Sequence, residues 1–238
     1  MEIYGMNFFV KFNLTDAFAD SLINHGEIYT NCAKYYIYQK EYKNAEGIGD
    51  DEEGTLLGIL RQNILLPLYC LYEVKQNDIM FRDGNYYIKI HKQMLNEFSK
   101  KNNDAFAVIN SNCFISAIEE FKKLYNLRFD RITYTHLSLN QQLSLITNKK
   151  GERLTIKAPE YAYQQEVRLI IDDPFPPLHI DKNYNIVYFE DKKLKEYKGK
   201  KYYIGNMSGY AMKFHKSDLL NLDELYYGLE LKRIKKIY

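Results

Sequence analysis

One short segment carries the side chains best suited to chemistry, because Gln164, Glu166 and Arg168 alternate within residues 163–170. Side chains two residues apart on a strand project from the same face. Glu166 and Arg168 therefore share a face, and Gln164 joins them if the strand begins early enough. A carboxylate at a strand edge, preceded by an amide, can hold a ribose hydroxyl or polarise a leaving group. By spacing alone, the pattern is more often a surface ion pair worth less than about 1 kcal/mol.

A second candidate is the glycine-rich acidic segment 47–54, in which four carboxylates follow one another at positions 50–53. These residues, Asp50, Asp51, Glu52 and Glu53, could bind a divalent cation. Asp50 or Asp51 together with Glu166 would suggest a metal-dependent nuclease. However, the EF-hand spacing is absent, and consecutive carboxylates rarely converge on one ion. The Glu-x-Lys pattern common in nucleases is also missing. A solvated loop without a metal is the expectation, and the nuclease ranks last among the possible functions.

Histidines and cysteines are scattered, so no structural zinc site is predicted. The five histidines form no HxxxH, HxH or HExxH pair, and the three cysteines form no CxxC pair. His25 falls at the expected end of a helix, where it complements the helix dipole. Cys113 falls at an expected helix start, where the pKa of a thiol can fall, although a buried structural cysteine is the commoner interpretation. The GxSxG, Walker and GxGxxG motifs are absent.

The composition is that of an ordinary folded protein whose small net charge creates no strong electrostatic field. The chain has 238 residues, 46% hydrophobic content and a formal net charge of +2, which allows a sizeable core in one domain over residues 1–238. Neither a nucleic-acid partner nor a basic partner is indicated by charge. No signal peptide or bilayer-spanning run is evident, and the unpaired cysteines favour a reducing cytoplasm. We therefore expect a cytoplasmic protein that does not associate with membranes.

The pattern of elements favours an α+β fold, a single domain with a mixed or mainly antiparallel sheet and a few packed helices. Thr15 and Gly26 are expected to cap a helix between them, and Asp83-Gly84 marks a hairpin turn within 80–90. Other strands are expected at 7–12, 27–30, 56–60, 69–74, 105–109, 131–137 and 165–172. Other helical segments are expected at 31–42, 92–100, 113–127 and 217–220.

The clearest of these helices is 113–127, which should pack on the sheet. Its apolar stripe comprises Phe114, Ala117, Ile118, Phe121, Leu124 and Tyr125. Because such a stripe requires a covered face, we predict that strands 7–12 and 165–172 share one sheet and that this helix covers it.

The chain contains four short sequence blocks in a characteristic order, namely Gly26–Tyr29, Gly47–Gly54, Asn112–Ser116 and Gln165–Leu169. Their order and spacing resemble those of an uncharacterised family of low-GC bacteria, prophages and mobile elements. The resemblance covers roughly residues 7–172. This sequence departs from the family where the acidic segment lacks a Pro-Phe pair and where Val167 replaces the usual aromatic residue. The family has no established activity, so the resemblance implies only a phage or mobile-element protein.

The chain is also similar to ADP-ribosyltransferases, which present a basic residue on an early strand, a serine on a middle strand and a Gln-x-Glu motif on a late strand. The similarity implies that Glu166 holds the nicotinamide ribose of NAD and stabilises the oxocarbenium-like transition state. Gln164 would position the acceptor. Lysine on the early strand lacks the bidentate fork of arginine. The residues implied for NAD binding are Lys11, His25, Ser111 and Arg168.

Two classes of function stay open. One is an NAD-consuming ADP-ribosyltransferase or glycohydrolase that acts in phage–host conflict without a metal. The other is a non-catalytic phage or mobile-element accessory protein that binds a protein or nucleic-acid partner. NAD turnover separates them, and Glu166→Gln should abolish activity with the fold intact if Glu166 is catalytic.

Overall fold

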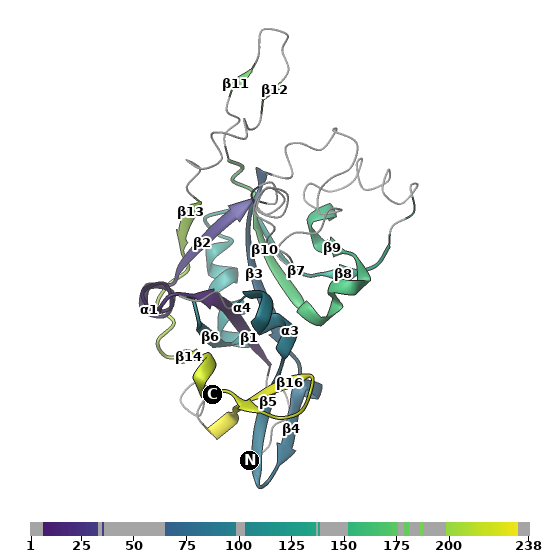
Figure 1. Cartoon of the computed structure of the whole chain (residues 1–238). Helices are drawn as coiled ribbons and strands as arrows, with labels where there is room; N and C mark the ends of the chain where they lie inside the picture. The colour runs from purple at the N-terminus through teal and green to yellow at the C-terminus, as the bar shows by residue number, and fades with distance from the viewer. Residues whose placement is uncertain are drawn as a thin grey trace.

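The computed structural model describes residues 7–32, 35, 65–98, 103–136, 138, 152–175, 179–180, 186–187 and 199–232. Within these ranges the chain is an α+β fold of mainly antiparallel sheets with packed helices (Figure 1), as predicted. The expectations for segments 47–54 and 56–60 lie outside the described residues. So does most of the helix expected at 31–42, but Asn31 and Cys32 belong to a strand instead.

Within the described ranges the largest sheet has eight antiparallel strands, in the order β13-β2-β3-β1-β6-β14, with β10 paired to β3 and β7 paired to β10. The predicted strands 7–12 and 165–172 correspond to β1 and β10, and each pairs with β3. The strands are β1 (Phe8–Leu14), β2 (Glu27–Cys32), β3 (Pro67–Val74), β6 (Ala105–Asn110), β7 (Leu127–Arg131), β10 (Glu166–Ile171), β13 (Lys200–Tyr203) and β14 (Ala211–His215).

β1 and β2 pair with the same edge of β3 and diverge along it. The opposite edge of β3 pairs with β10, from Leu68 to Tyr72. On the shared edge, β1 pairs with residues 72–74 and β2 pairs with residues 67–68. On this edge, residues 69–71 of β3 therefore have no strand partner within the described ranges and face a gap between β1 and β2.

A four-stranded antiparallel sheet in the order β15-β16-β5-β4 packs near one face of the main sheet. The predicted hairpin joins β4 to β5, and Asp83 and Gly84 adopt φ values of 50° and 79° at its turn, as hairpin turns of this kind require. The alternation of β1 places Phe8 and Val10 in this layer and Phe9 in the opposite one. The strands are β4 (Ile79–Arg82), β5 (Asn85–His91), β15 (Leu220–Asn221) and β16 (Tyr226–Glu230).

Helix α4 (Ser111–Phe121) covers the opposite face of the main sheet, where Phe114, Ile118 and Phe121 are buried against Phe9 and its neighbours. The prediction that this helix continues to Leu127 is wrong. Leu127 pairs with Ile171 in the β7–β10 ladder, so the chain has to leave the helix before it.

The start of α4 also differs from the prediction. Asn110 caps the helix by accepting a hydrogen bond from the Cys113 backbone N–H at 3.1 Å. Cys113 is exposed, so its interpretation as a buried structural cysteine is wrong.

The remaining elements are short. The helix expected at 92–100 is α3 (Lys92–Phe98), and the turn expected at 217–220 is the 3-10 helix η6 (Lys216–Asp218). The strand expected at 131–137 divides between β7 and β8, while residue 137 lies outside the described ranges. The other elements are η2 (Gln76–Asp78), β8 (Thr133–Tyr134), η3 (Glu152–Thr155), β9 (Ile156–Lys157), η4 (Pro159–Gln164), β11 (His179–Ile180) and β12 (Ile186–Val187).

The caps of α1 (Asp16–His25) agree with the sequence. The Thr15 hydroxyl accepts a hydrogen bond from the Phe18 N–H at 3.3 Å, and Gly26 ends the helix at a φ of 64°. A β-carbon added at Gly26 would lie 2.0 Å from the backbone oxygen of Gly205. Glycine is therefore required here both by conformation and by space.

We expect Gly26→Ala to lower the free energy of unfolding by at least about 1–3 kcal/mol, because the left-handed conformation is strained for alanine and the backbone at Gly205 blocks the new methyl group. Gly209→Ala is the matched control, since a β-carbon there meets nothing within 4 Å. Urea unfolding curves of both variants measure the difference. Equal stabilities would contradict this view of the helix end.

Candidate functional site

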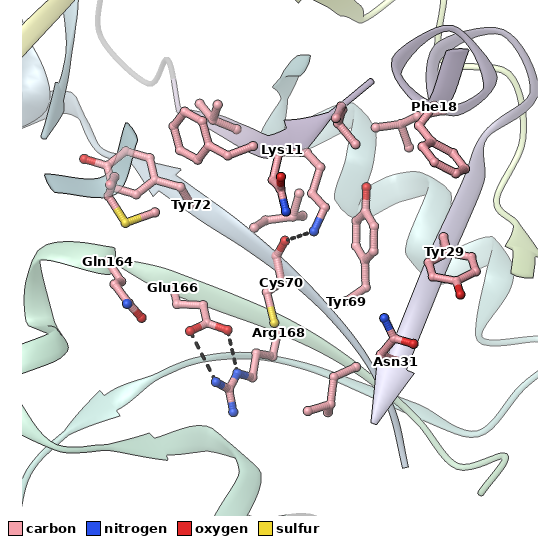
Figure 2. Close-up of a pocket in the computed structure, with 18 of the residues that line it drawn as sticks. Lys11, Phe18, Tyr29, Asn31, Tyr69, Cys70, Tyr72, Gln164, Glu166 and Arg168 are labelled. Atoms are coloured by element: carbon pink, nitrogen blue, oxygen red, sulfur yellow. Dashed lines mark hydrogen bonds and ion pairs between the residues drawn. The ribbon is translucent and has the colours of Figure 1, made fainter. Parts of the chain in front are cut away.

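A pocket of about 490 Å³ lies at the gap where β1 and β2 diverge along β3. This volume is within the range of about 300–1,000 Å³ that is typical of small-ligand sites. Figure 2 shows aromatic and amide side chains from α1 and β2 at one end, Lys11 from β1 in the middle and the charged residues of β10 at the other end. The labelled lining residues are Lys11, Phe18, Tyr29, Asn31, Tyr69, Cys70, Tyr72, Gln164, Glu166 and Arg168.

Four of the predicted site residues line this pocket, namely Lys11, Gln164, Glu166 and Arg168. The other two lie elsewhere. His25 is exposed at the end of α1. Ser111 is buried at the start of α4, and its backbone N–H donates to the Asn7 carbonyl. The sequence order of these residues therefore does not bring all of them to one place.

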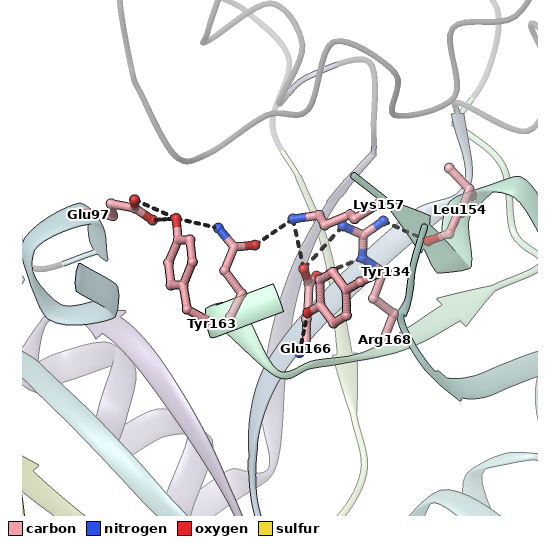
Figure 3. A network of polar contacts seen from close by, with 8 residues as sticks. Glu97, Tyr134, Leu154, Lys157, Tyr163, Glu166 and Arg168 are labelled. Atoms are coloured by element: carbon pink, nitrogen blue, oxygen red, sulfur yellow. Dashed lines mark hydrogen bonds and ion pairs between the residues drawn. The ribbon is translucent and has the colours of Figure 1, made fainter. Parts of the chain in front are cut away.

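Glu166 and Arg168 form a buried ion pair, so the alternative of a surface pair is wrong. The residues are 7% and 2% exposed, respectively. Arg168 Nε donates to Glu166 Oε1 at 2.6 Å, and Nη2 donates to Oε2 at 3.3 Å (Figure 3). The third guanidinium nitrogen, Nη1, donates to the Leu154 carbonyl at 2.6 Å. The arginine is thus fixed by the carboxylate on one side and by the backbone on the other.

Lys157 is a second cation on the same carboxylate, and no pattern in the sequence predicts it. Its Nζ lies 2.9 Å from Glu166 Oε2, and the lysine side chain is 5% exposed. Lys157 comes from β9, which pairs with β8 and not with β10, so no local spacing links it to Glu166. Tyr134 of β8 is a further unexpected neighbour, since its hydroxyl accepts a hydrogen bond from the Glu166 backbone N–H at 2.8 Å.

The charge state of Glu166 follows from these contacts. Burial by itself raises the pKa of the carboxyl group, but the charges of Arg168 and Lys157 and the hydrogen bond from Arg168 outweigh it and hold the pKa well below its usual range. Burial and the negative charge of Glu166 raise the pKa of the neighbouring Cys70 thiol to about 12. At neutral pH the pocket therefore contains a carboxylate and a protonated thiol side by side.

Gln164 reaches this cluster from a 3-10 helix and not from the strand. Gln165 has a φ of 39° and ends η4. β10 therefore begins only at Glu166, too late for Gln164 to share its strand face. Its Oε1 nevertheless accepts a hydrogen bond from Lys157 Nζ at 2.8 Å, and its Nε2 donates to the Tyr163 hydroxyl at 3.4 Å. Tyr163 in turn donates to Glu97 at 2.5 Å (Figure 3).

Lys11 occupies a different environment in the middle of the pocket. Its Nζ donates to the Cys70 carbonyl at 3.0 Å, in the gap between β1 and β2, and lies 4.5 Å from the centre of the Tyr69 ring. Burial lowers the pKa of Lys11, and the nearby Cys70 and Glu166 groups oppose this only in part. The aromatic end of the pocket is more open, because Phe18 and Tyr29 are 48% and 40% exposed and their ring centres are 6.3 Å apart.

Comparison with known proteins gives no function for this site. No protein-family model, curated protein or solved structure matches the chain. Among the described residues, no three His, Cys, Asp or Glu side chains are grouped in a way that could hold a metal ion. No helix in those ranges is long and apolar enough to cross a membrane. The chemistry of the pocket therefore carries the functional argument.

Proposed function

We propose that the protein binds NAD in this pocket and breaks the bond between nicotinamide and ribose, as an ADP-ribosyltransferase-like enzyme or a glycohydrolase. The observation that supports this is the ionised carboxylate of Glu166 at one end of a pocket of nucleotide size. Aromatic and amide side chains, including Phe18, Tyr29 and Asn31, offer contacts for a base at the other end. A cytoplasmic role in phage–host conflict, in which NAD is consumed, belongs to the same proposal.

The proposed reaction uses charge and not a metal. As the C–N bond breaks, its electron pair leaves with nicotinamide and positive charge develops on the ribose. A fixed carboxylate beside that carbon stabilises the transition state more than the ground state. Water or an acceptor nucleophile then forms the new bond to the ribose carbon and releases a proton. Glu166 supplies the charge, and Gln164, next to it through Lys157, orients the acceptor.

The ion pairs that Glu166 makes with Arg168 and Lys157 favour a second candidate function, without catalysis. The Glu166 carboxylate is already paired with Arg168 and Lys157, and the Glu166 side chain is only 8% exposed. Two adjacent cations reduce the net negative field at the ribose, and a ribose hydroxyl has to displace one of them to reach the carboxylate. This arrangement suits a non-catalytic accessory protein in which the charged cluster fixes the shape of a surface that binds a protein or nucleic-acid partner.

NAD turnover separates these candidates. We expect the purified protein to release nicotinamide from NAD, alone or with cell lysate as a source of acceptor, and chromatography of nicotinamide with NAD labelled in its adenylate part measures both release and transfer. EDTA should leave the rate unchanged if no metal takes part. NAD binding by calorimetry without any release would overturn the proposed cleavage and leave a non-catalytic role for the pocket. The absence of both binding and release would overturn the NAD proposal.

A further inference from the structure

The two lysines that line the pocket differ in their partners. Lys157 lies 2.9 Å from a Glu166 oxygen and donates to Gln164 as well, so its amine is held in the charged form. Lys11 forms no ion pair with any residue that the structure describes. Its hydrogen bond is to the neutral Cys70 carbonyl, and its other close neighbour is the face of the Tyr69 ring. The charged state of Lys11 is thus supported much less than that of Lys157.

The position of Lys11 follows from the divergence of β1 and β2. The Cys70 carbonyl faces the gap between these strands, and the lysine side chain supplies a donor for it. A single carbonyl engages one of the three protons of a lysine ammonium group. Lys11 as a whole residue is half-buried, and it lines the pocket, so a small ligand in the pocket can reach its side chain. Burial lowers its pKa, which enlarges the neutral fraction that carries a lone pair.

Other nucleophiles in the pocket are less reactive by the same reasoning. The Cys70 thiol, which also lines the pocket, has its pKa raised to about 12 by burial and by Glu166, and a thiol is a poor nucleophile until it loses its proton. Burial raises the pKa of the Tyr69 hydroxyl far above its usual range. The amine of Lys157 is paired with a carboxylate. A desolvated lysine in an apolar pocket is a recognised form of activated nucleophile.

We infer that Lys11 is a nucleophilic amine that forms an imine with the carbonyl group of an aldehyde or ketone ligand in this pocket. The neutral Nζ attacks the carbonyl carbon, and a proton passes from nitrogen to oxygen to give a carbinolamine. The C–O bond then breaks, the oxygen leaves as water with the second amine proton, and a C=N bond remains. No oxidant or reductant is needed. The inference does not depend on NAD cleavage, because it uses Lys11 and not the carboxylate of Glu166.

Reductive trapping tests this directly. The full chain is incubated with a low concentration of benzaldehyde and sodium cyanoborohydride, which reduces the imine to a stable secondary amine, and peptide mass spectrometry locates the adduct. We expect modification at Lys11 to be faster than at Lys122 and Lys123, which lie on the exposed surface of the protein in ion pairs with glutamates.

Two variants control this experiment. Lys11→Arg keeps the positive charge but forms no imine, so the fast adduct should disappear, and circular dichroism shows whether the variant is folded. Lys122→Arg should leave the fast adduct in place. The position of the adduct in the wild-type protein, located by peptide mass spectrometry, is decisive even if Lys11→Arg does not fold. Modification of Lys11 no faster than that of the exposed lysines, or a fast adduct that persists in folded Lys11→Arg, would overturn the inference. Trapping at Lys11 without nicotinamide release from NAD leaves it standing while the NAD proposal fails.

Discussion

Glu166→Gln will lower the free energy of unfolding by about 3–5 kcal/mol, the cost typical of removing one partner from a buried ion pair. The substitution keeps the shape of the side chain but removes its charge. Arg168 and Lys157 are then left almost fully buried, at 2% and 5% exposure of their side chains, without a counter-charge. Urea unfolding at neutral pH measures the loss.

Glu73→Gln is a matched control for this effect. Glu73 is as buried as Glu166, at 4% exposure, and Arg131 binds it through two nitrogens at 2.6–3.0 Å. However, the Arg131 side chain is 69% exposed and returns to water when the carboxylate is lost. We expect Glu73→Gln to cost about 1 kcal/mol or less, as for exposed pairs. Equal losses in the two variants would contradict the role assigned to the buried cations.

The pH dependence of stability gives a second measurement of the same cluster. The pKa of Glu166 is lower in the folded state than the usual 4.5, so the unfolded state binds the proton more tightly. The resulting stabilisation is fully present above about pH 4.5 and is lost as the pH falls toward the folded-state pKa. Glu166→Gln lacks this contribution. The stabilities of wild type and variant should therefore converge as the pH falls below about 4.5.

The same substitution bears on the proposed activity. Removing one preorganised charge from a transition state typically lowers the rate about 100-fold to 1,000-fold. The sequence by itself predicts that Glu166→Gln leaves the fold intact, whereas the burial of both cations makes a large loss of stability the expected result. Rates of nicotinamide release therefore have to be compared under conditions in which Glu166→Gln is folded. Glu73→Gln should retain the wild-type rate, because Glu73 does not line the pocket.

Much of the fold could be predicted because its signals are local. The cap residues Thr15 and Gly26, the turn Asp83-Gly84 and the alternation within β1 each depend on neighbours a few residues away. The shared face of Glu166 and Arg168 is also local, and their contact confirms it.

The features of the site that could not be predicted depend on contacts distant in sequence or on backbone geometry. The burial of Glu166 and Arg168 depends on the layers around β10. Lys157 reaches Glu166 from a strand in another sheet. Gln164 lies off the strand because Gln165 adopts a positive φ, a conformation that glutamine seldom takes and that its sequence context does not signal. The divergence of β1 and β2, which creates the pocket, is a property of strand register along β3.

The apolar stripe at residues 113–127, from which the long helix was predicted, has a buried part and an exposed part in the structure. Substitutions in the two parts should therefore differ in their effect on stability. Phe114 is fully buried, and its ring centre lies 5.7 Å from those of Phe9 and Phe129. Phe114→Ala should lower the free energy of unfolding by about 3–5 kcal/mol through lost contacts and a cavity. Leu124 lies beyond the end of α4 and is 76% exposed, so Leu124→Ala should change stability by less than about 0.5 kcal/mol.

Chemical denaturation of the two variants distinguishes a helix that ends at Phe121, as in the structure, from one that continues to Leu127, as the sequence pattern predicts. A helix that continued to Leu127 would bury Leu124 on the same face as Phe114, and the two substitutions would then have costs of similar size. The ladder between β7 and β10 rules out that continuation, because Leu127 is already paired with Ile171. A loss of several kcal/mol in Leu124→Ala would show that the stripe is buried along its whole length and that β7 does not begin at Leu127.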